Sequence, residues 1–450
     1  MDRDALVDRY DRRVPRYTSY PTALQFHAVG DDGWYRDWLA ALPAAEEVSL
    51  YLHVPFCRAM CWYCGCHTRV AKDDRPVWSY VAALRGEIAL IAASIGRRAA
   101  VRRIHWGGGT PTLLSQEAFA ALFQDLSEQF EIRSGAEHAV EADPRGLDEA
   151  RIEALARAGV TRVSRGVQTL SDAVQRRINR VQPFAQVATA VARLRAAGIV
   201  DLNFDLMYGL PGQTVADVVA TATAVAELRP SRLALFGYAH VPWMKPHQRR
   251  IDEGALPGAG ERLDQLLAGA ETLARAGYAP IGFDHFARDD DALARAAAEG
   301  RLRRNFQGYT DDASSVLIGI GASAISQMAQ GYAQNTVAIP DWQRAVFAGR
   351  LPVAKMRALN ADDVLRRDVI ERLMCDLRVD LAPLLTRHGV ADSYLDDSLR
   401  QLDDAVADGL VRIDARRIEI SERGRPFVRT VAAAFDAYLA SAETRHARAV

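Results

Sequence analysis

The chain has 450 residues, enough for one large α/β domain with additions or for two or three ordinary domains. Hydrophobic residues make up 49% and charged residues 25% of the sequence; these values exclude a collagen-like, low-complexity or largely disordered chain. Because 56 Lys and Arg face 57 Asp and Glu, the formal net charge is −1. Overall charge therefore predicts neither a nucleic-acid nor an anionic membrane partner.

No membrane segment is expected either. The longest stretch without a formal charge, Ala313 to Pro340, is interrupted by serine, glutamine and asparagine, which a bilayer core would penalise. The N-terminal sequence MDRDALVDRYDRR mixes acids and bases and contains no apolar core of a secretory signal. We expect a cytoplasmic protein.

The N-terminal residues 1–45 read as an arm, and from residue 48 short apolar runs alternate with amphipathic stretches. Repeated strand-then-helix units predict a parallel sheet with right-handed crossovers, as an open doubly wound sheet or a full or partial (β/α) barrel. The predicted strands are 48–54, 101–106, 138–143, 162–167, 200–207, 232–239 and 278–284. Predicted helices lie between them, for example EAFAALFQDLSEQF and PFAQVATAVARLRAAG.

The turns that follow these strands favour a barrel. Each predicted strand ends in a polar, Gly-rich or Pro-rich turn: HVPFCRAMCWYCGC, HWGGGTPT, EADPR, RGVQT, YGLPGQT, YAHVP and FDHF. Parallel α/β folds place their sites at the carboxyl ends of strands, and a barrel brings those ends together at one mouth. We therefore expect all seven turns to line one cavity.

The pattern changes after about residue 355. The sequence of residues 355–450 predicts helices, then a hairpin in LVRIDARRIEISERG and a closing helix. Helices followed by a two-stranded wing resemble a winged-helix module, which is best known for DNA binding. No basic stripe gathers there, so a mainly helical packing domain is the favoured interpretation.

Cysteine placement is the most informative feature. The chain has five cysteines, and four of them are Cys57, Cys61, Cys64 and Cys66. Clustered thiols in a cytosolic protein indicate a metal or redox site rather than a disulfide framework. The fifth, Cys375, follows apolar positions at helical spacing and is expected to be a small buried hydrophobe.

The spacing of the four thiols favours one kind of metal site. Structural zinc sites take two pairs of ligands separated by a dozen or more residues, whereas three close thiolates on one loop suit three corners of an iron–sulfur cubane. Three protein ligands would leave one iron open for a ligand. Cys66 could ligate, pair with another group or line the site, and the spacing does not choose among these.

The motif Cys-x3-Cys-x2-Cys after the first strand of a βα repeat resembles the radical S-adenosylmethionine (SAM) superfamily. The form YLHVPFCRAMCWYCGCHT resembles the family of oxygen-independent coproporphyrinogen III oxidases. The likeness continues, in order, through RYTSYPTA, HWGGGTPT, EADPR, GVQ, INR, NFDLMYGLPGQT, YAHVP, FDHFAR, RNFQGYT, GASAIS and YAQN. So many ordered matches make the resemblance specific, although a glycine triplet alone would be weak.

The resemblance implies a fold and a set of site residues. It implies a radical SAM partial (β/α) barrel at 46–285, an extension at 286–354 that closes the active site, and the C-terminal domain at 355–450. It makes Cys57, Cys61 and Cys64 the ligands of one [4Fe–4S] cluster, with SAM on the fourth iron. The implied SAM contacts are Tyr51, Tyr63, Gly108, Gly109, Thr110, Glu141, Gln168, Arg180, Asp205, Ala239 and Ile325. Cys66, Phe306 and Gln307 are implied to line the active site or to lie beside a second SAM.

Several of these residues have a structural alternative when taken alone. A strand-end carboxylate such as Glu141 or Asp205 is as typical of a helix cap as of a ligand contact. The strand-end histidines lack regular ligand spacing and are expected to be hydrogen-bonded structural residues: His53, His105, His240 and His285. The sequence also departs from the family at Arg165 and Thr169, which flank GVQ where relatives carry an apolar residue and Asp.

The resemblance also implies the reaction: oxidative decarboxylation of two propionates of coproporphyrinogen III to vinyl groups, giving protoporphyrinogen IX in haem biosynthesis. A low-potential electron donor and an unidentified electron acceptor are implied, and a monomer is expected. Arginine suits the substrate carboxylates, and the candidates are Arg16, Lys245, Arg249, Arg250 and Arg288. The alternatives are a haem-binding chaperone of the same superfamily and a regulator that binds nucleic acid through the C-terminal module.

Overall fold

The computed structural model describes residues 3–439, which divide into two compact units. The first, here the cysteine-loop unit, comprises Phe26–Asp205 and Ser314–Ala358. The second, here the C-terminal unit, comprises Met1–Gln25, Leu206–Ala313 and Leu359–Val450. Each unit is assembled from segments that are far apart in the sequence. The two units therefore do not coincide with the predicted segments 1–45, 46–285, 286–354 and 355–450.

The cysteine-loop unit is built on parallel strands. Strands β14, β2, β5, β6 and β7 lie next to one another in this order, and each pairs with its neighbour in parallel. β2 is buried at almost every position and reads as a continuous apolar run, as expected for a strand covered on both faces. The bounds are β2 Val48–Val54, β5 Ala100–Gly108, β6 Glu131–Ala142, β7 Arg162–Gln168 and β14 Val316–Ile320.

Antiparallel strands extend this sheet beyond β14. β15, β16, β17 and β1 follow β14 in that order, each antiparallel to the one before. Strands β14, β15 and β16 lie within the segment 286–354 that was predicted as an extension, β14 is parallel to β2, and β1 comes from the N-terminal segment. The bounds are β15 Ile325–Met328, β16 Gly331–Asn335, β17 Val353–Ala358 and β1 His27–Ala28; the short β3 Phe56–Cys57 and β4 Arg69–Val70 pair separately.

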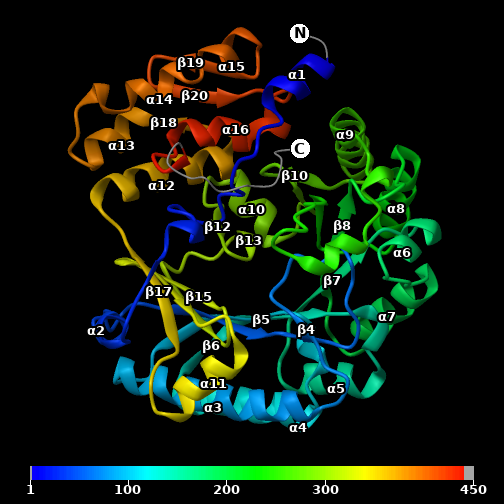
Figure 1. The fold of residues 1–450 in the computed structure, drawn as a ribbon, viewed down its shortest axis with the longest axis vertical. Helices are drawn as coiled ribbons and strands as arrows, with labels where there is room; N and C mark the ends of the chain where they lie inside the picture. The colour runs from blue at the N-terminus through cyan, green and yellow to red at the C-terminus, as the bar shows by residue number, and fades with distance from the viewer. Residues whose placement is uncertain (1–2, 440–450) are drawn as a thin grey trace. The chain divides into compact units, whose positions relative to one another are not determined.

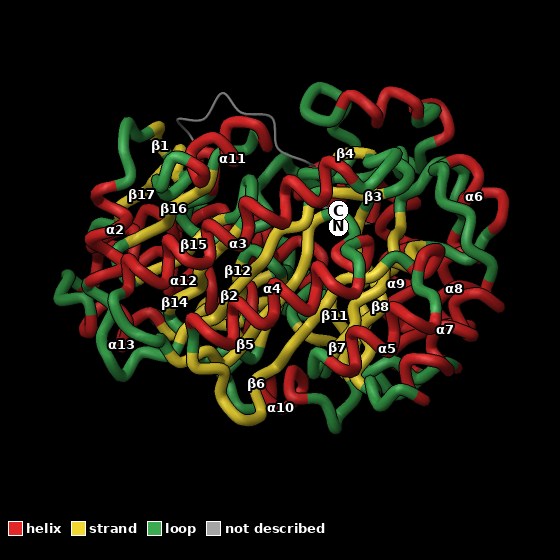
Figure 2. The backbone as a smooth tube through the Cα atoms, turned by 90° about the horizontal axis from the view of Figure 1, so that it is seen from below, coloured by secondary structure: helices red, strands yellow, loops and turns green. Residues whose placement is uncertain are grey.

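Helices cover the parallel strands of this unit, and α3 and α4 run across β2, β5 and β6 in Figure 2. α3 starts with Pro at its first turn and ends at Gly96, whose φ of 72° lets the chain turn left-handed. It is the one helix among residues 3–439 that is long and apolar enough to cross a membrane, but half of its apolar window is buried, as in a core helix. The bounds are α2 Gly33–Ala40, α3 Arg75–Ile95, α4 Gln116–Gln129, α5 Glu149–Arg157, α6 Asp172–Arg177, α7 Phe184–Ala196 and α11 Ile339–Phe347.

Strand β8 (Asp201–Tyr208) begins in the cysteine-loop unit and ends in the C-terminal unit. Its side chains alternate between buried and half-buried, the period expected of a strand. The first four predicted strands are confirmed as parallel strands, with β6 longer than predicted, and the fifth is confirmed as strand β8.

The last predicted strand, 278–284, is wrong in its extent. It is a hairpin of β10 (Ala279–Ile281) and β11 (His285–Ala287), and β11 pairs antiparallel with β9 (Arg232–Gly237). Gly282 turns the chain with φ of 56° after only three residues, which period-2 hydrophobicity cannot show. The segment FDHF spans this turn and the start of β11. Helices α8 (Val215–Glu227), α9 (Ala259–Arg275) and α10 (Ala292–Ala298) and the hairpin β12 (Arg303–Asn305) and β13 (Gly308–Thr310) complete this part.

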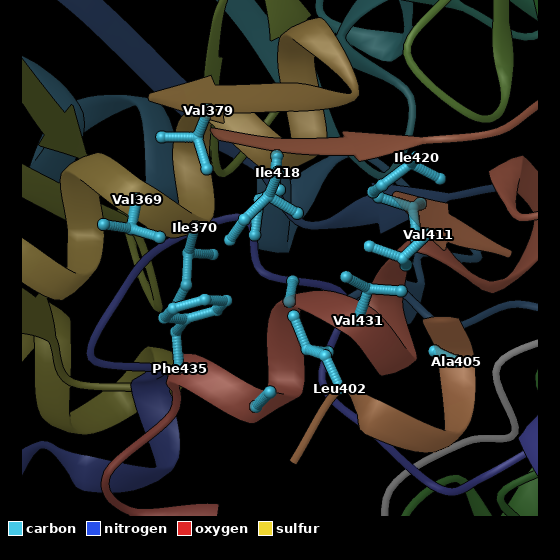
Figure 3. Packing of buried hydrophobic residues seen from close by; sticks show 14 of the residues in the cluster. Val369, Ile370, Val379, Leu402, Ala405, Val411, Ile418, Ile420, Val431 and Phe435 are labelled. Atoms are coloured by element: carbon cyan, nitrogen blue, oxygen red, sulfur yellow. The ribbon is translucent and has the colours of Figure 1, made fainter. Parts of the chain in front are cut away.

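The C-terminal module packs around an apolar core, shown in Figure 3. Ile370 and Phe435 face Ile418 and Leu402 across this core. The predicted hairpin is confirmed as β19 and β20, and a third strand, β18, joins β20 to give the sheet of a winged-helix-like module. The bounds are α12 Ala361–Asp376, β18 Arg378–Asp380, α13 Leu381–Arg387, α14 Asp396–Arg400, α15 Asp403–Ala407, β19 Val411–Asp414, β20 Arg417–Ile420 and α16 Val428–Ala432.

The N-terminal helix α1 (Arg3–Tyr10) belongs to the same core, beside α16 in Figure 1. The Tyr10 hydroxyl donates to the Asp408 carboxylate, and Thr430 Oγ1 donates to the Tyr10 carbonyl at 2.9 Å. Arg9 pairs with Asp408 at 3.0 Å. The first part of the predicted arm 1–45 thus contains a docked helix, which a short charged sequence does not reveal. Residues 26–45, with β1 and α2, belong to the cysteine-loop unit instead.

Candidate active site

The cysteine loop leaves β2 and is tied down by backbone bonds. Cys57 ends β3, and the Ala71 N–H donates to its carbonyl at 2.9 Å. Asn179 Nδ2 donates to the Met60 carbonyl at 2.8 Å, so the segment after α6 holds the middle of the loop. Cys61 is buried, Cys57 and Cys64 are half-buried, and Cys66 is exposed. Three thiols are therefore presented from one constrained loop.

Hydrogen-bond donors surround two of these sulfurs. Thr110 Oγ1 donates to Cys57 Sγ at 3.3 Å. Arg145 Nη2 and Arg180 Nη1 each lie 3.5 Å from Cys61 Sγ. Burial raises the pKa of the Cys57 thiol, while its hydrogen bonds with Thr110 and Thr68 act in the opposite direction. The thiolate is the form that binds metal.

Asp143 holds both arginines in place. Its Oδ2 accepts from Arg145 Nη2 at 2.6 Å and from Arg180 Nη1 at 3.3 Å. Burial alone would raise the pKa of Asp143, but the two guanidinium groups lower it to about 2. The carboxylate therefore stays ionised and keeps the guanidinium groups aimed at Cys61.

The glycine run Gly107–Gly109 at the end of β5 provides space rather than side chains. A Cβ at Gly107 would lie 2.7 Å from Glu141 Oε1 and 2.9 Å from the Tyr51 ring. A Cβ at Gly109 would lie 2.6 Å from the Phe56 carbonyl oxygen, next to the first cysteine. The backbone of this turn therefore approaches both the cysteine loop and Glu141 as no other residue type would allow.

Two carboxylates lie on β6 and β8, the strands on either side of β7. Glu141 Oε2 accepts from the Gly108 N–H at 3.1 Å, and its other oxygen lies 3.3 Å from His105 Nε2. Burial, followed by the nearby Glu141 charge, raises the pKa of Asp205 to about 7. The pair would be stabilised by a ligand that brings hydroxyl donors and positive charge, as the ribose, ammonium and sulfonium groups of SAM do.

The end of β7 carries strain and unpaired polar atoms. Gln168 has φ of 65°, which is unusual for a residue with a side chain and is typical of functional sites. Its Oε1 is buried without a hydrogen-bond partner, and so is Arg180 Nε. Arg180 Nη2 donates to the Gly166 carbonyl at 2.6 Å. Unpaired buried atoms beside the thiols fit a site that receives a polar ligand.

These observations fit an iron–sulfur cluster better than a single metal ion. Within residues 3–439, no group of three or more His, Cys, Asp or Glu side chains is placed to hold one ion. A four-iron cubane has a different requirement, because each thiolate binds its own iron. The strand-end histidines are hydrogen-bonded, as expected; His53, for example, lies 3.0 Å from the Tyr51 hydroxyl.

Two family models match the chain. The radical SAM superfamily matches residues 51–225, and the HemN C-terminal domain matches residues 359–427. Over all 450 residues the chain is 50% identical to the oxygen-independent coproporphyrinogen III oxidase of Bradyrhizobium diazoefficiens, covering 100% of both proteins. The chain belongs to the oxygen-independent coproporphyrinogen III oxidase family.

Further relatives agree with this assignment. The Escherichia coli oxidase is 39% identical over 437 residues, covering 97% of this chain and 95% of that protein. The solved structure of E. coli coproporphyrinogen III oxidase, described as a radical SAM enzyme, superimposes with a TM-score of 0.89 at 37% identity. It covers 95% of this chain and 100% of that one. A radical SAM partial barrel with a winged-helix-like C-terminal domain is therefore confirmed.

The cysteine-loop unit brings together most residues that the family resemblance indicates. Tyr51 lies on β2 and Tyr63 in the cysteine loop, with Gly108, Gly109 and Thr110 beside them. Ile325 begins β15 in the same unit. The C-terminal unit holds the remaining predicted residues: Ala239, Phe306, Gln307, Arg16, Lys245, Arg249, Arg250 and Arg288.

The basic candidates differ in their surroundings. Arg16 is exposed, and its Nη2 donates to the Gly237 carbonyl at 3.1 Å. Arg288 is ion-paired with Asp290 at 2.5 Å, and its N–H donates to the Ser231 carbonyl just before β9 begins. Arg16 and Arg288 therefore contact opposite ends of β9, and the structure does not bring them together.

Three residues that shape this site were not predicted from the sequence. Asp143 and Arg145 stand in the quoted EADPR segment, and Gly107 is the first glycine of HWGGGTPT. Their roles depend on contacts with Cys61 and Glu141. The matched motifs contained these positions, but only the folded geometry assigns the contacts.

Proposed function

We propose that this protein is an oxygen-independent coproporphyrinogen III oxidase that converts two propionate side chains of coproporphyrinogen III to vinyl groups. The observation that carries the proposal is the full-length identity of 50% to a named oxidase, together with three cysteines on one constrained loop. This favours the oxidase over the haem-binding chaperone. When bound, the [4Fe–4S] cluster and SAM supply a radical that can remove hydrogen from an unactivated carbon, which no side chain can do.

The chain's own residues bind and orient. Cys57, Cys61 and Cys64 would hold three irons of the cluster, and the fourth iron would remain for SAM. Gly108, Gly109 and Thr110 would contact SAM, and Gly107 leaves room for the Glu141 and Tyr51 side chains at the end of β5. Glu141 and Asp205 would accept hydrogen bonds from SAM, while Arg180, held by the Gly166 carbonyl, lies against Cys61.

We also propose roles for the remaining site residues. Tyr51, Tyr63, Gln168, Ala239 and Ile325 complete the proposed SAM contacts, and Cys66, Phe306 and Gln307 line the active site or contact a second SAM. We propose a monomer that works in the cytoplasm, where four clustered thiols stay reduced. It would require a low-potential electron donor and a separate electron acceptor, but neither nucleic acid nor a membrane.

The test is an anaerobic assay of the reconstituted protein with SAM, a low-potential reductant, coproporphyrinogen III and cell extract as electron acceptor. We expect protoporphyrinogen IX and 5′-deoxyadenosine together. A matched sample of the Cys61→Ala variant should form neither product. If wild-type protein forms 5′-deoxyadenosine but no vinyl product, the substrate assignment is wrong. Tight haem binding with neither product would support the chaperone instead.

A further inference from the structure

The turn between β14 and β15 has a backbone that few residues adopt. It runs from Gly321 to Ala324, and Gly321 and Ser323 have φ of 104° and 66°. A positive φ costs free energy for a residue with a side chain, such as Ser323, so the surrounding structure must hold the turn. Ile325, a proposed SAM contact, follows directly and begins β15. The position of Ile325 therefore depends on what holds this turn.

The turn lies beside the end of β2, which leads into the cysteine loop. β14 and β2 are parallel, and Gly319 is paired with Tyr51. A Cβ at Gly319 would lie 2.6 Å from the Ile325 carbonyl oxygen. A Cβ at Gly321 would lie 2.7 Å from the His53 carbonyl oxygen. Close backbone packing at two glycines thus places Ile325 next to the strand that carries Tyr51, another proposed SAM contact.

A buried carboxylate of α3 holds the first residue of the turn. Glu87 is 1% exposed, and its Oε2 accepts from the Gly321 N–H at 2.8 Å. Asn335 Nδ2 donates to Glu87 Oε1 at 2.6 Å and to the Gly321 carbonyl at 2.9 Å. Trp342 Nε1 donates to Glu87 Oε2 at 2.9 Å. Both backbone polar groups of Gly321 are therefore fixed, one by Glu87 and the other by the amide that Glu87 orients.

Tyr80, seven residues earlier on α3, holds the next residue of the turn. Its hydroxyl accepts from the Ala322 N–H at 2.9 Å and donates to the His53 carbonyl at 2.8 Å. The Tyr80 ring stacks on that of Trp342, with the ring centres 4.4 Å apart. Residues seven apart lie on one face of a helix. One face of α3 therefore joins the turn after β14 to the end of β2 through Glu87 and Tyr80.

We propose that Glu87 and Tyr80 are positioning residues for SAM, because they hold the turn 321–324 and thereby set the place of Ile325 against the end of β2. The proposal rests on the proposed function, in which Ile325 and Tyr51 contact SAM. Glu87 and Tyr80 themselves act through backbone groups. All of these residues belong to the cysteine-loop unit.

The energetic cost of Glu87 supports a role in placement rather than in packing. Burial raises the pKa of Glu87 to about 7, because the ionised carboxyl loses its hydration there. An apolar side chain of similar size would pack α3 without this cost. It could not accept hydrogen bonds from Gly321 and Asn335, so the carboxylate is needed where the strained turn must be held.

The experiment measures SAM binding by the cluster-loaded wild-type, Glu87→Gln and Tyr80→Phe proteins at about pH 8, above the raised pKa of Glu87. Glu87→Gln replaces one acceptor oxygen by a donor, and Tyr80→Phe keeps the ring but removes the hydroxyl. Since each change removes at least one buried hydrogen bond of this network, we expect Kd for SAM, measured by equilibrium dialysis, to rise about 5-fold to 20-fold. The double variant should lose less than the product of the two effects, because both residues hold one turn.

EPR of the reduced cluster gives a second readout. Without SAM, both variants should show the wild-type spectrum, because the cysteine ligands are unchanged. The change in the spectrum that SAM causes should require a SAM concentration raised by the same factor as Kd. A purely structural defect would instead reduce the amount of cluster and leave this concentration unchanged.

A matched control separates placement from loss of stability. Leu194→Ala removes a fully buried side chain from the last turn of α7 in the same unit. It should lower the free energy of unfolding, measured by urea denaturation, at least as much as Glu87→Gln does. Kd for SAM should nevertheless stay within about twofold of the wild-type value.

Two results would overturn the proposal: an unchanged Kd for SAM in both Glu87→Gln and Tyr80→Phe, or an equal rise in Leu194→Ala. Dialysis needs neither turnover nor a porphyrin, so both results are decisive whether or not the wild-type protein forms protoporphyrinogen IX. A wild-type protein that binds SAM but forms no protoporphyrinogen IX would overturn the proposed function alone.

Discussion

The two compact units carry polar sites of opposite character. In the cysteine-loop unit, thiols and the carboxylates Glu141 and Asp205 are gathered at strand ends, where they suit iron and a cationic ligand. In the C-terminal unit, Arg16 and Arg262 lie beside Gly237 at the end of β9. The overall charge of −1 hides this separation. Local charge therefore depends on which strand ends meet.

The largest expected effect concerns the thiols. Changing Cys57, Cys61 or Cys64 to Ala should abolish cluster assembly and reduce activity by at least about 1,000-fold, because the radical chemistry depends on the cofactor. Cys66→Ala should still assemble a cluster, and so should Cys375→Ala, a buried cysteine far along the sequence. Absorbance and EPR after anaerobic reconstitution measure this. If the Cys66→Ala protein contains no iron after reconstitution, Cys66 is needed for the cluster and the assignment of three ligands is wrong.

The glycine turn gives the next effect. Gly107→Ala places a methyl group against Glu141 and Tyr51, so Kd for SAM should rise about 10-fold or more, equivalent to 1.4 kcal/mol. The matched control is Gly65→Ala in the cysteine loop, where a Cβ meets nothing within 4 Å. Equilibrium dialysis with SAM measures both variants. Equal affinities would mean that Glu141 and Tyr51 do not contact SAM.

Buried Arg165 sharpens the contrast with accessible Arg16. Arg165 is fully buried, its Nε and Nη2 have no hydrogen-bond partner, and burial lowers its pKa to about 10. Arg165→Met should raise the free energy of unfolding by about 1–3 kcal/mol, because it removes a buried cation whose one hydrogen bond goes from Nη1 to the Val187 carbonyl at 3.3 Å. Urea denaturation measures the change. Arg165→Lys, which keeps the charge, should not stabilise the protein. If Arg165→Met instead lowers the free energy of unfolding, the guanidinium group makes a net stabilising interaction.

The smallest effect is a pH dependence of the cofactor-free protein. The pKa of Asp205 is raised to about 7 and that of Glu87 also to about 7, in both cases first by burial. Both carboxyls therefore hold protons in the folded state at pH values where the unfolded chain, with pKa near 4, has lost them. The free energy of unfolding should fall as pH rises from about 4 to 7, by at most about 1.4 kcal/mol per pH unit for each group.

Asp205→Asn should flatten this slope, whereas the exposed Glu128→Gln should leave it unchanged. Urea denaturation at several pH values measures the slope. A slope that is equally steep in Asp205→Asn would show that the carboxyl is not responsible.

Much of this protein could be predicted from its sequence. The parallel strands, the helices between them and the C-terminal hairpin follow from hydrophobic period and turn residues, which are local properties. The three cysteines and the motif order indicated the family. The hairpin at 279–287 was missed because strands of three residues carry too little periodicity to be detected.

Tertiary structure decided which of these residues meet. The bonds from Arg145 to Cys61 and from Arg429 to Pro15 join residues that are far apart in the chain. So does the approach of Arg262 to Gly237. Such contacts depend on how strands and helices pack, so no local pattern contains them. The sequence by itself determined the chemistry that is available, and the tertiary structure decided which of these groups meet.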